Sequence, residues 1–338
     1  MEARSRLRLM ACDSGQIFAQ RVAAELTRIL EREGERRFEL TRSQEVLFAN
    51  REVKTILDES VRGDDVYVVQ CMDDPLSERS VNDNLMAVCT ALGAAREGDA
   101  ECITAVLPHF PYARQERKKA RESITARQVA RFLEISGADR VLTLDLHAEA
   151  ICGFFERATL DNLRATQVII AHFRSIHSLE NLTVVSPDIG SADRARSISR
   201  QLGCDIAICD KERDYSKPGV VKSARLVGEV RDRDVLMVDD MIATAGSIIE
   251  AAQTCRKAGA RAVYLGCSHP FFNGEALRRL DDAYAAGVFK LVLGTDSVVR
   301  GEPFALAHPW YQEVSVAPLV AQVLFHINRR QSVSTLMG

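Results

Sequence analysis

Short apolar runs alternate with amphipathic segments along the whole chain. In the first half, apolar runs predict buried strands at 7–12, 66–69, 102–107 and 141–144. Apolar residues spaced three and four apart predict helices at 15–33 and 82–96 and a third that begins after Thr125. Between these elements lie a polar excursion near Phe48 and the most basic stretch of the chain, 112–131.

The same alternation starts again in the second half. Strands are predicted at 183–185, 205–208, 225–230, 235–238, 261–266 and 290–293, and helices at 166–176, after Gly190, at 248–257 and at 316–329. The polar segment 211–221 is predicted to be a loop. Strands separated by helices are typical of α/β proteins with mostly parallel sheets. Two successive copies of the pattern predict two similar halves that meet near residue 155.

The stretch 235–249 combines a buried strand, two carboxylates and a turn of small residues that opens a helix. Asp239 and Asp240 follow the apolar run directly, and the turn spans 243–247. Backbone N–H groups and the positive end of the helix dipole make such a turn an anion site. Two carboxylates would repel a phosphate, so they are better suited to sugar hydroxyls or a metal ion. A plain helix cap has the same pattern, and that alternative stays open at this point.

The composition is typical of an ordinary globular protein. Of 338 residues, 46% are hydrophobic and 27% charged, and the formal net charge of -3 gives no basic field that would favour nucleic acid or an anionic membrane. Nine cysteines without a C-x-x-C pair favour reduced thiols over a disulfide framework or a zinc site. Neither a signal peptide nor a membrane span is recognisable, so we expect a cytoplasmic protein.

Polar side chains follow four of the predicted strands at their carboxyl ends. Asp145 and His147 follow one strand, Asp188 a second, Lys211 and Arg213 a third, and the two acids of the opening stretch a fourth. Ligands of open α/β sheets bind beyond the carboxyl ends of the strands. The four groups are therefore candidates for a single site.

Eight short stretches resemble the ribose-phosphate pyrophosphokinase family, whose members make phosphoribosyl pyrophosphate (PRPP). They are NDNLM from Asn82, YARQ from Tyr112, DLHA from Asp145, GFF from Gly153, DNL from Asp161, VSPD from Val185, VDDM from Val238 and SVS from Ser332. They occur in the order of the family. The resemblance implies two phosphoribosyltransferase-like domains, each a mostly parallel sheet flanked by helices. It places them at 1–157 (ATP and subunit contacts) and 158–310 (ribose 5-phosphate site and catalytic lid), and 311–338 packs back on the N-terminal half.

The resemblance also implies a reaction and its substrate-binding residues. The β,γ-pyrophosphoryl group of ATP is transferred to the 1-hydroxyl of ribose 5-phosphate, giving PRPP and AMP for nucleotide biosynthesis. The residues that match ATP contacts of the family are Phe48, Asn50, Glu52, Arg114, Gln115 and His147. Those that match its ribose 5-phosphate site are Asp239, Asp240, Thr244, Ala245, Gly246 and Ser247. The run 117–121 is also compatible with a solvated basic loop.

The resemblance assigns catalysis to a lid and to a metal ion. Lys211 and Arg213 match the mobile catalytic loop of the family, although ordinary surface charges would look the same. His147 and Asp188 match its Mg²⁺ ligands; a hydrogen-bonded core histidine is the alternative for His147. The expected assembly is a homo-oligomer, a hexamer built from dimers, in which the loop near Phe48 reaches a neighbouring subunit. Phosphate and ADP are expected as effectors near Ser60, Arg62 and Arg121.

The chain departs from the family pattern at several positions. Ala243 stands where the family commonly has a third acid, Lys119 where many relatives have an acid, Ser268 where threonine is usual and Ser123 where proline is usual. The segment 73–81 and the lid are longer than usual. Two alternatives therefore stay open beside the enzyme. One is a non-catalytic regulatory homologue, and the other is a phosphoribosyltransferase that consumes PRPP, which the presence of an ATP half disfavours.

Overall fold

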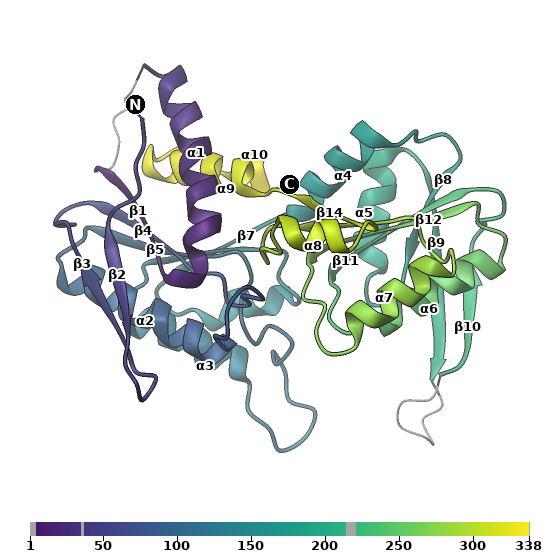
Figure 1. Ribbon diagram of the computed structural model, residues 1–338, viewed down its shortest axis with the longest axis horizontal. Coiled ribbons are helices and arrows are strands. Elements are labelled where there is room, and N and C mark those ends of the chain that lie inside the picture. The colour runs from purple at the N-terminus through teal and green to yellow at the C-terminus, as the bar shows by residue number, and fades with distance from the viewer. Residues whose placement is uncertain (1–4, 35–36, 214–220, 338) are drawn as a thin grey trace. The chain divides into compact units, whose positions relative to one another are not determined.

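The structure is a computed structural model that describes residues 5–34, 37–213 and 221–337, without the side chains of 211–213, 221–224, 335 and 337. The chain divides into two compact units (Figure 1). Unit 1 comprises Met1–Ala165, Asp296–Val299 and Ser315–Gly338, and unit 2 comprises Thr166–Thr295 and Arg300–Val314.

Unit 1 is built on a sheet of five parallel strands. Their order is β1 (Leu7–Ala11), β4 (Asp65–Val69), β5 (Cys102–Leu107), β6 (Arg140–Leu144) and β7 (Thr159–Leu163). One face is covered by α1 (Gln16–Arg32) and α9 (Ala317–Asn328), the other by α2 (Val81–Glu97) and α3 (Thr125–Ile135) (Figure 1). Every residue of β4 and β5 is buried, which explains why these strands are continuous apolar runs in the sequence.

A separate antiparallel hairpin lies outside this sheet. It consists of β2 (Ser43–Leu47) and β3 (Val53–Leu57), and β3 runs along α2. The sequence pattern did not predict it, because most of its residues are only half-buried or exposed and no apolar alternation marks its strands. Unit 1 also contains two 3-10 turns, Asp13–Gly15 and Glu149–Phe154, and the short helix α10 (Ser334–Met337).

The end of the chain belongs to unit 1. The side chain of Asn328 on α9 donates to Asp65 at the start of β4 at 3.0 Å. Asp296, which is fully buried, accepts from Arg21 on α1 at 2.8 Å and from the backbone N–H of Val316 at 2.7 Å. These contacts hold α9 against the unit.

Unit 2 has a sheet of seven strands. The order is β10 (Val221–Val227), β9 (Asp205–Arg213), β8 (Leu182–Ser186), β11 (Asp234–Met241), β12 (Ala262–His269), β13 (Leu291–Thr295) and β14 (Tyr311–Val314), and only the β9–β10 pair is antiparallel among them. Its helices are α4 (Ala165–Ile176), α5 (Ala192–Leu202), α6 (Gly246–Lys257), α7 (Ala276–Ala285) and α8 (Glu302–Ala307). The expected α/β class with mostly parallel sheets is confirmed.

The predicted loop 211–221 is wrong at both ends. β9 continues through Arg213, and β10 already begins at Val221. These ends form a ladder at the edge of the sheet, where backbone hydrogen bonds join the two strands. The sequence pattern also missed β7, β14, α7 and α8, because each is short or mixed in polarity.

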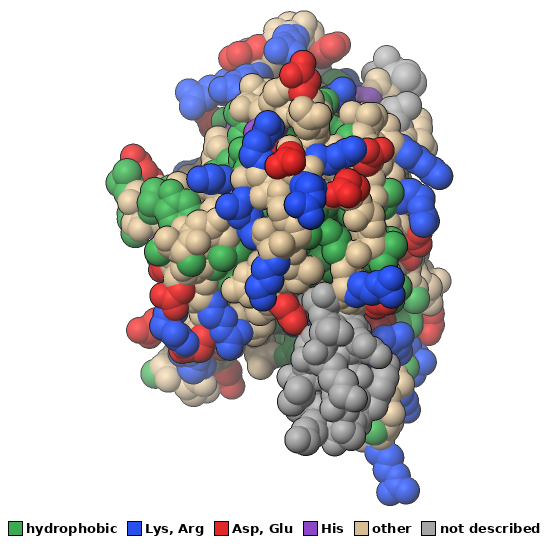
Figure 2. Space-filling model, turned by 90° about the vertical axis from the view of Figure 1, so that its right-hand side faces the viewer, with side chains coloured by type: hydrophobic (Ala, Val, Ile, Leu, Met, Phe, Trp, Pro, Cys, Tyr) green, Lys and Arg blue, Asp and Glu red, His purple; other side chains and the backbone are tan. Residues whose placement is uncertain are grey.

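The surface of unit 2 mixes both charges. Figure 2 shows Lys and Arg side chains interspersed with Asp and Glu over one face. Among the described helices, none is long and apolar enough to cross a membrane. All nine cysteines, each within the described ranges, are thiols.

Candidate active site

The tip of the β2–β3 hairpin carries Phe48, Asn50 and Glu52. The N–H of Phe48 donates to the carbonyl of Glu52 at 2.8 Å, and the side chain of Asn50 accepts from the N–H of Glu52 at 3.2 Å. Arg51 closes the turn with a φ of 70°. Phe48 is 47% exposed. An exposed aromatic ring beside two polar side chains can stack on a base while its neighbours bond the edge of that base.

A cavity of about 460 Å³ lies beside this tip. Phe48, Asn50 and Glu52 line it from the hairpin, and Asn82 and Met86 line it from the first turns of α2. It has the size of a small-molecule site, and its lining combines apolar surface with a few polar groups.

Arg114 and Gln115 lie in the loop after β5 and are exposed. The N–H of Gln115 donates to the carbonyl of Tyr112 at 2.9 Å, and Tyr112 has a φ of 57°. The Tyr112 hydroxyl donates to the side chain of Asn82, which lines the cavity. The loop that carries the arginine is thus fixed to the same end of α2 as the cavity.

His147 projects from the carboxyl end of β6. The turn before it is held by β7, because the N–H of Asp145 donates to Leu163 at 2.9 Å and the N–H of Leu146 to the side chain of Asn162 at 3.0 Å. Asp145 is buried, with a φ of 37°, whereas His147 is exposed. The exposed imidazole does not fit the alternative of a core histidine.

In unit 2, Asp188 lies in the turn between β8 and α5. Its Oδ1 accepts from the N–H of Ser191 at 2.9 Å. A Cβ at Gly190 would lie 3.3 Å from the same oxygen, so glycine leaves room around this half-buried carboxylate. The turn brings Asp188 to the carboxyl end of the sheet, next to the end of β11.

Asp239 and Asp240 are the two residues before Met241, the last residue of β11, and they share a counterion. Nη1 of Arg194, on α5, lies 3.0 Å from Oδ1 of Asp239 and 3.4 Å from Oδ1 of Asp240. The hydroxyl of Ser191 donates to the same Asp239 oxygen at 3.1 Å. Burial and the neighbouring Asp240 raise the pKa of Asp239 to about 7, against the lowering effect of Arg194. The pair is thus a crowded acid site with partial neutralisation.

The turn of small residues follows two residues after this pair. Ala245 is the N-cap of α6 and has a φ of 61°, a left-handed conformation that disfavours any side chain. The carbonyl of Ala243 accepts from the N–H of Asn273 at 2.8 Å, and that of Thr244 accepts from Arg279 at 3.1 Å. The first turn of a helix has N–H groups without intrahelical acceptors, and here a guanidinium lies beside it. This arrangement can bind a phosphate.

Comparisons with known proteins agree on one family. Residues 7–137 match the model of the N-terminal domain of ribose phosphate pyrophosphokinase, and residues 158–308 match that of the phosphoribosyl transferase domain. The ribose-phosphate pyrophosphokinase of Listeria ivanovii is 36% identical over 98% of this chain and 97% of its own length. That of Campylobacter jejuni is 38% identical over 86% and 88%. The chain belongs to the ribose-phosphate pyrophosphokinase family.

A solved structure gives the same result for the fold. The crystal structure of phosphoribosylpyrophosphate synthetase from Mycobacterium smegmatis matches with a TM-score of 0.82 and 32% identity, over 96% of this chain and 99% of that one. The expected fold of two phosphoribosyltransferase-like domains is confirmed, as is the enzyme class, a ribose-phosphate pyrophosphokinase. The comparisons do not favour the non-catalytic alternative.

The residues that the resemblance to this family predicts for the site fall into two groups, one in each unit. Unit 1 holds the hairpin tip, the loop of Arg114 and His147. Unit 2 holds Asp188, the acid pair Asp239 and Asp240, and the turn 243–247 (the phosphate turn). Because His147 and Asp188 belong to different units, a metal ion shared by them stays a prediction. Among the described residues, no cluster of three or more His, Cys, Asp or Glu side chains could hold a metal ion by itself.

Lys211 and Arg213, expected on the lid of a pyrophosphokinase, have the backbone of a strand. Both lie in β9, where Lys211 pairs with Ala224 and Arg213 with Val221. Their side chains lie outside the described part of the chain. The expected location on a loop is therefore corrected, whereas their chemical role stays a prediction.

Sequence reasoning missed three side chains at this site: Ser191, Arg194 and Arg279. Arg194 lies in the first turn of α5, where acidic residues suit the helix dipole better than a cation does. A cation in that position, six residues after a strand-end aspartate, is a signal of an anionic partner outside the helix. Ser191 and Arg279 carry no comparable signal, because their contacts depend on how distant elements pack.

Proposed function

We propose that this chain transfers the β,γ-pyrophosphoryl group of ATP to the 1-hydroxyl of ribose 5-phosphate, releasing PRPP and AMP. The observation that carries the proposal is the sequence of sites at the end of β11. Two carboxylates that share Arg194 as a counterion are followed, two residues later, by a helix-opening turn of small residues. Such a site suits a molecule with vicinal hydroxyls at one end and a phosphate at the other, which is the chemistry of ribose 5-phosphate.

In this proposal, Asp239 and Asp240 accept hydrogen bonds from the ribose hydroxyls. The 5-phosphate binds the turn Thr244, Ala245, Gly246 and Ser247 through backbone N–H groups and hydroxyls. Arg279, whose Nη1 lies 3.1 Å from the carbonyl of Thr244, adds positive charge beside the phosphate. Position 243, just beyond β11, is an alanine and offers the sugar no carboxylate. In this proposal the sugar is therefore bound by the two carboxylates at the end of β11, Asp239 and Asp240.

ATP occupies unit 1 in the proposal. Phe48 stacks on the adenine, and Asn50 and Glu52 bond its edge. Arg114 binds phosphate oxygens through its guanidinium fork, with Gln115 beside it. Because Phe48 at the hairpin tip is 47% exposed, we propose that the tip serves the site of a neighbouring subunit in a homo-oligomer, a hexamer built from dimers.

The donor set fits a Mg²⁺ ion held mostly by substrate. This ion usually keeps several waters and takes one or two protein carboxylates together with substrate phosphates. Asp188 supplies one carboxylate, which accepts one backbone hydrogen bond at 2.9 Å, and the exposed His147 supplies one ring nitrogen or a water contact. When bound, the ion neutralises charge on the ATP phosphates. Asp188 and His147 would hold and orient it.

The transfer itself needs positioning and charge neutralisation more than covalent chemistry. The 1-hydroxyl oxygen attacks the β-phosphorus, the bond between that phosphorus and the α,β-bridging oxygen breaks, and AMP leaves with the bridging oxygen. Lys211 and Arg213 stabilise the charge that develops on the leaving and transferred phosphates. Cations that reach the phosphates only in the transition state raise kcat without tightening substrate binding.

Two further properties belong to the proposal. Nine thiols favour a reducing compartment, the cytoplasm.

Phosphate and ADP are proposed as effectors near Ser60, Arg62 and Arg121. Arg62 donates to Asp99 at 2.7 Å, and its N–H donates to the hydroxyl of Ser60 at 3.4 Å. A dianion would therefore compete with Asp99 for the guanidinium.

The direct test is release of AMP from ATP and magnesium by the purified full chain, with and without ribose 5-phosphate. We expect AMP release that depends on ribose 5-phosphate and falls strongly in Asp240→Ala. AMP release that is independent of the sugar phosphate, or absent while ATP binds, would reject the proposal and favour a regulatory homologue.

A further inference from the structure

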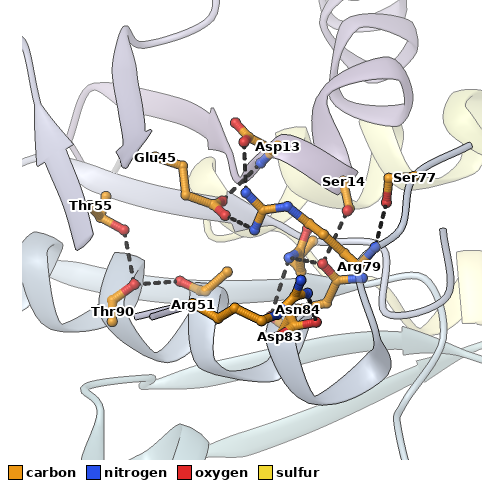
Figure 3. Close-up of polar contacts among 12 residues, drawn as sticks. Asp13, Ser14, Glu45, Arg51, Thr55, Ser77, Arg79, Asp83, Asn84 and Thr90 are labelled. Carbon is orange, nitrogen blue, oxygen red and sulfur yellow. Dashed lines mark hydrogen bonds and ion pairs between the residues drawn. The ribbon is translucent and has the colours of Figure 1, made fainter. Parts of the chain in front are cut away.

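The long segment between β4 and α2 brings an arginine under the hairpin that carries Phe48. Arg79 lies at the end of this segment, just before the start of α2 (Figure 3). It forms ion pairs with Glu45 of β2 and with Asp13, and the Asp13 pair measures 2.9 Å. The side chain of Arg79 is 12% exposed and that of Glu45 only 4%. One guanidinium therefore joins three segments of unit 1.

The carboxylate of Glu45 depends on this arginine. Its second oxygen accepts from the backbone N–H of Asp13 at 3.0 Å, so the group is almost enclosed. A buried carboxylate that loses its cation is strongly destabilised, because water cannot replace the partner. Without Arg79, Glu45 loses this cation and β2 loses its tie to the segment before α2, so the hairpin is less firmly held.

Two further contacts hold the other parts of the hairpin. Arg51 at the tip pairs with Asp83 at 2.7 Å, and the hydroxyls of Thr55 on β3 and Thr90 on α2 are 3.0 Å apart (Figure 3). The bond from Arg51, followed by those from Ser80, lowers the pKa of Asp83. Arg51 is more exposed than Arg79, so its ion pair is more strongly screened. A two-stranded hairpin is marginal in water, and its orientation therefore rests on contacts of this kind.

Arg79 also borders the place where a base would bind. It lines the 460 Å³ cavity together with Phe48, Asn50 and Glu52. Moving β2 would therefore move the stacking ring and the two groups that bond the base, while the acid pair and phosphate turn belong to unit 2.

We propose that Arg79 is a positioning residue for nucleotide selection: through Glu45 it fixes the hairpin tip and so sets the affinity for ATP and the preference for adenine over guanine. The proposal rests on the proposed function for its substrates, but its geometry stands on unit 1 alone. It applies whether the tip serves its own subunit or a neighbour.

The test compares Arg79→Ala, Arg79→Lys and Glu45→Ala in the full chain, with Arg28→Ala as the matched control. Arg28 is an exposed arginine of α1 that pairs with Glu25 of the same helix. The readouts are KM and kcat for ATP and for GTP, KM for ribose 5-phosphate, equilibrium binding of both nucleotides, and the unfolding temperature.

We expect Arg79→Ala to raise the KM for ATP about tenfold and to reduce the ATP-to-GTP preference by a similar factor, with the KM for ribose 5-phosphate within about twofold of wild type. Arg79→Lys should give values between those of wild type and Arg79→Ala, because an ammonium cannot bridge two carboxylates as a planar guanidinium does. Since Arg79 acts through Glu45, the double variant Arg79→Ala, Glu45→Ala lacks the unpaired carboxylate and should resemble Glu45→Ala rather than show the product of the two single effects. Arg28→Ala should match wild type.

Two results would overturn the proposal. The first is an unchanged KM for ATP and an unchanged base preference in folded Arg79→Ala. The second is a parallel loss for both substrates together with a lower unfolding temperature, which indicates a merely structural role. If Arg79→Ala does not fold, Arg79→Lys decides by the same two readouts. If wild type releases no AMP, the proposed function fails, and equilibrium binding of ATP against GTP still tests Arg79.

Discussion

Nη1 of Arg194 lies 3.0 Å from Oδ1 of Asp239, so the crowded acid pair of the second unit has its own counterion. The contact joins the first turn of α5 to the end of β11. It explains how two adjacent carboxylates can remain at one strand end. It also makes Arg194 part of the proposed sugar site, through its contacts with the two carboxylates.

Removing this cation should weaken ribose 5-phosphate binding. In Arg194→Met the apolar stem remains and the charge is lost, so the pKa of Asp239 rises further and less of it is ionised near neutral pH. We expect the KM for ribose 5-phosphate to rise about tenfold, the equivalent of one pKa unit, with little change in the KM for ATP. Arg196→Met is the control, because Arg196 is an exposed residue of the same helix paired with Asp193. Equal KM values for the two variants would exclude this role of Arg194.

The raised pKa of Asp239 makes a prediction about stability. Between its ordinary pKa of 3.8 and the folded value of about 7, the folded protein binds a proton that the unfolded chain has lost. Stability from this group is therefore present at low pH and is lost as pH rises through about 7. Asp239→Asn should raise the unfolding temperature relative to wild type at pH 8, and much less at pH 5. Asp193→Asn, at a side chain 95% exposed, should show no such difference. A pH-independent gain would contradict the assignment.

The same group should control the pH dependence of substrate binding. The ionised carboxylate accepts hydrogen bonds from hydroxyls more strongly than the protonated form does, so the KM for ribose 5-phosphate should fall as pH rises through about 7. Steady-state kinetics between pH 5.5 and 8.5, taken as about one unit and a half on either side, would measure this. A flat profile would show that Asp239 stays ionised throughout.

The left-handed conformation of Ala245 predicts a stabilising substitution. A Cβ in this conformation costs about 1–2 kcal/mol, and glycine loses about 0.5–1 kcal/mol through its flexible unfolded state. Ala245→Gly should therefore stabilise unit 2 by about 0.5–1 kcal/mol. Ala243→Gly, two residues away and without a positive φ, should destabilise it. Opposite signs in urea unfolding would confirm the strain, and a loss of stability in both variants would refute it.

The catalytic role of Lys211 is tested by the division between kcat and KM. If its ammonium acts on the transition state, Lys211→Ala should lower kcat by about 100-fold or more, with a much smaller rise in KM. An effect confined to KM would indicate ground-state binding instead.

The sequence predicted those parts of the site that follow directly from strand ends. Asp188, Asp239 and Asp240 lie where parallel strands end, and the period of buried strands reveals such positions. The β2–β3 hairpin could not be predicted in this way, because its strands are only partly buried and depend on ion pairs with distant residues such as Arg79. Arg194 likewise acquires its role only when α5 packs beside β11.

The segment 211–221 shows the same limit from the other side. Its polar composition favours a loop, yet β9 continues to Arg213 because an antiparallel edge pair is held by backbone hydrogen bonds. Side-chain polarity reports burial, whereas this strand pairing depends on backbone groups. Composition therefore could not predict the strand conformation at the two ends of the segment.

The most direct test of the central claim identifies the products of ATP and ribose 5-phosphate by ³¹P NMR. Transfer of the pyrophosphoryl group predicts AMP and PRPP in equal amounts, with the diphosphate on carbon 1. ADP together with a ribose bisphosphate would mean transfer of the γ-phosphoryl group alone. That result, or AMP without PRPP, would contradict the function proposed for this site.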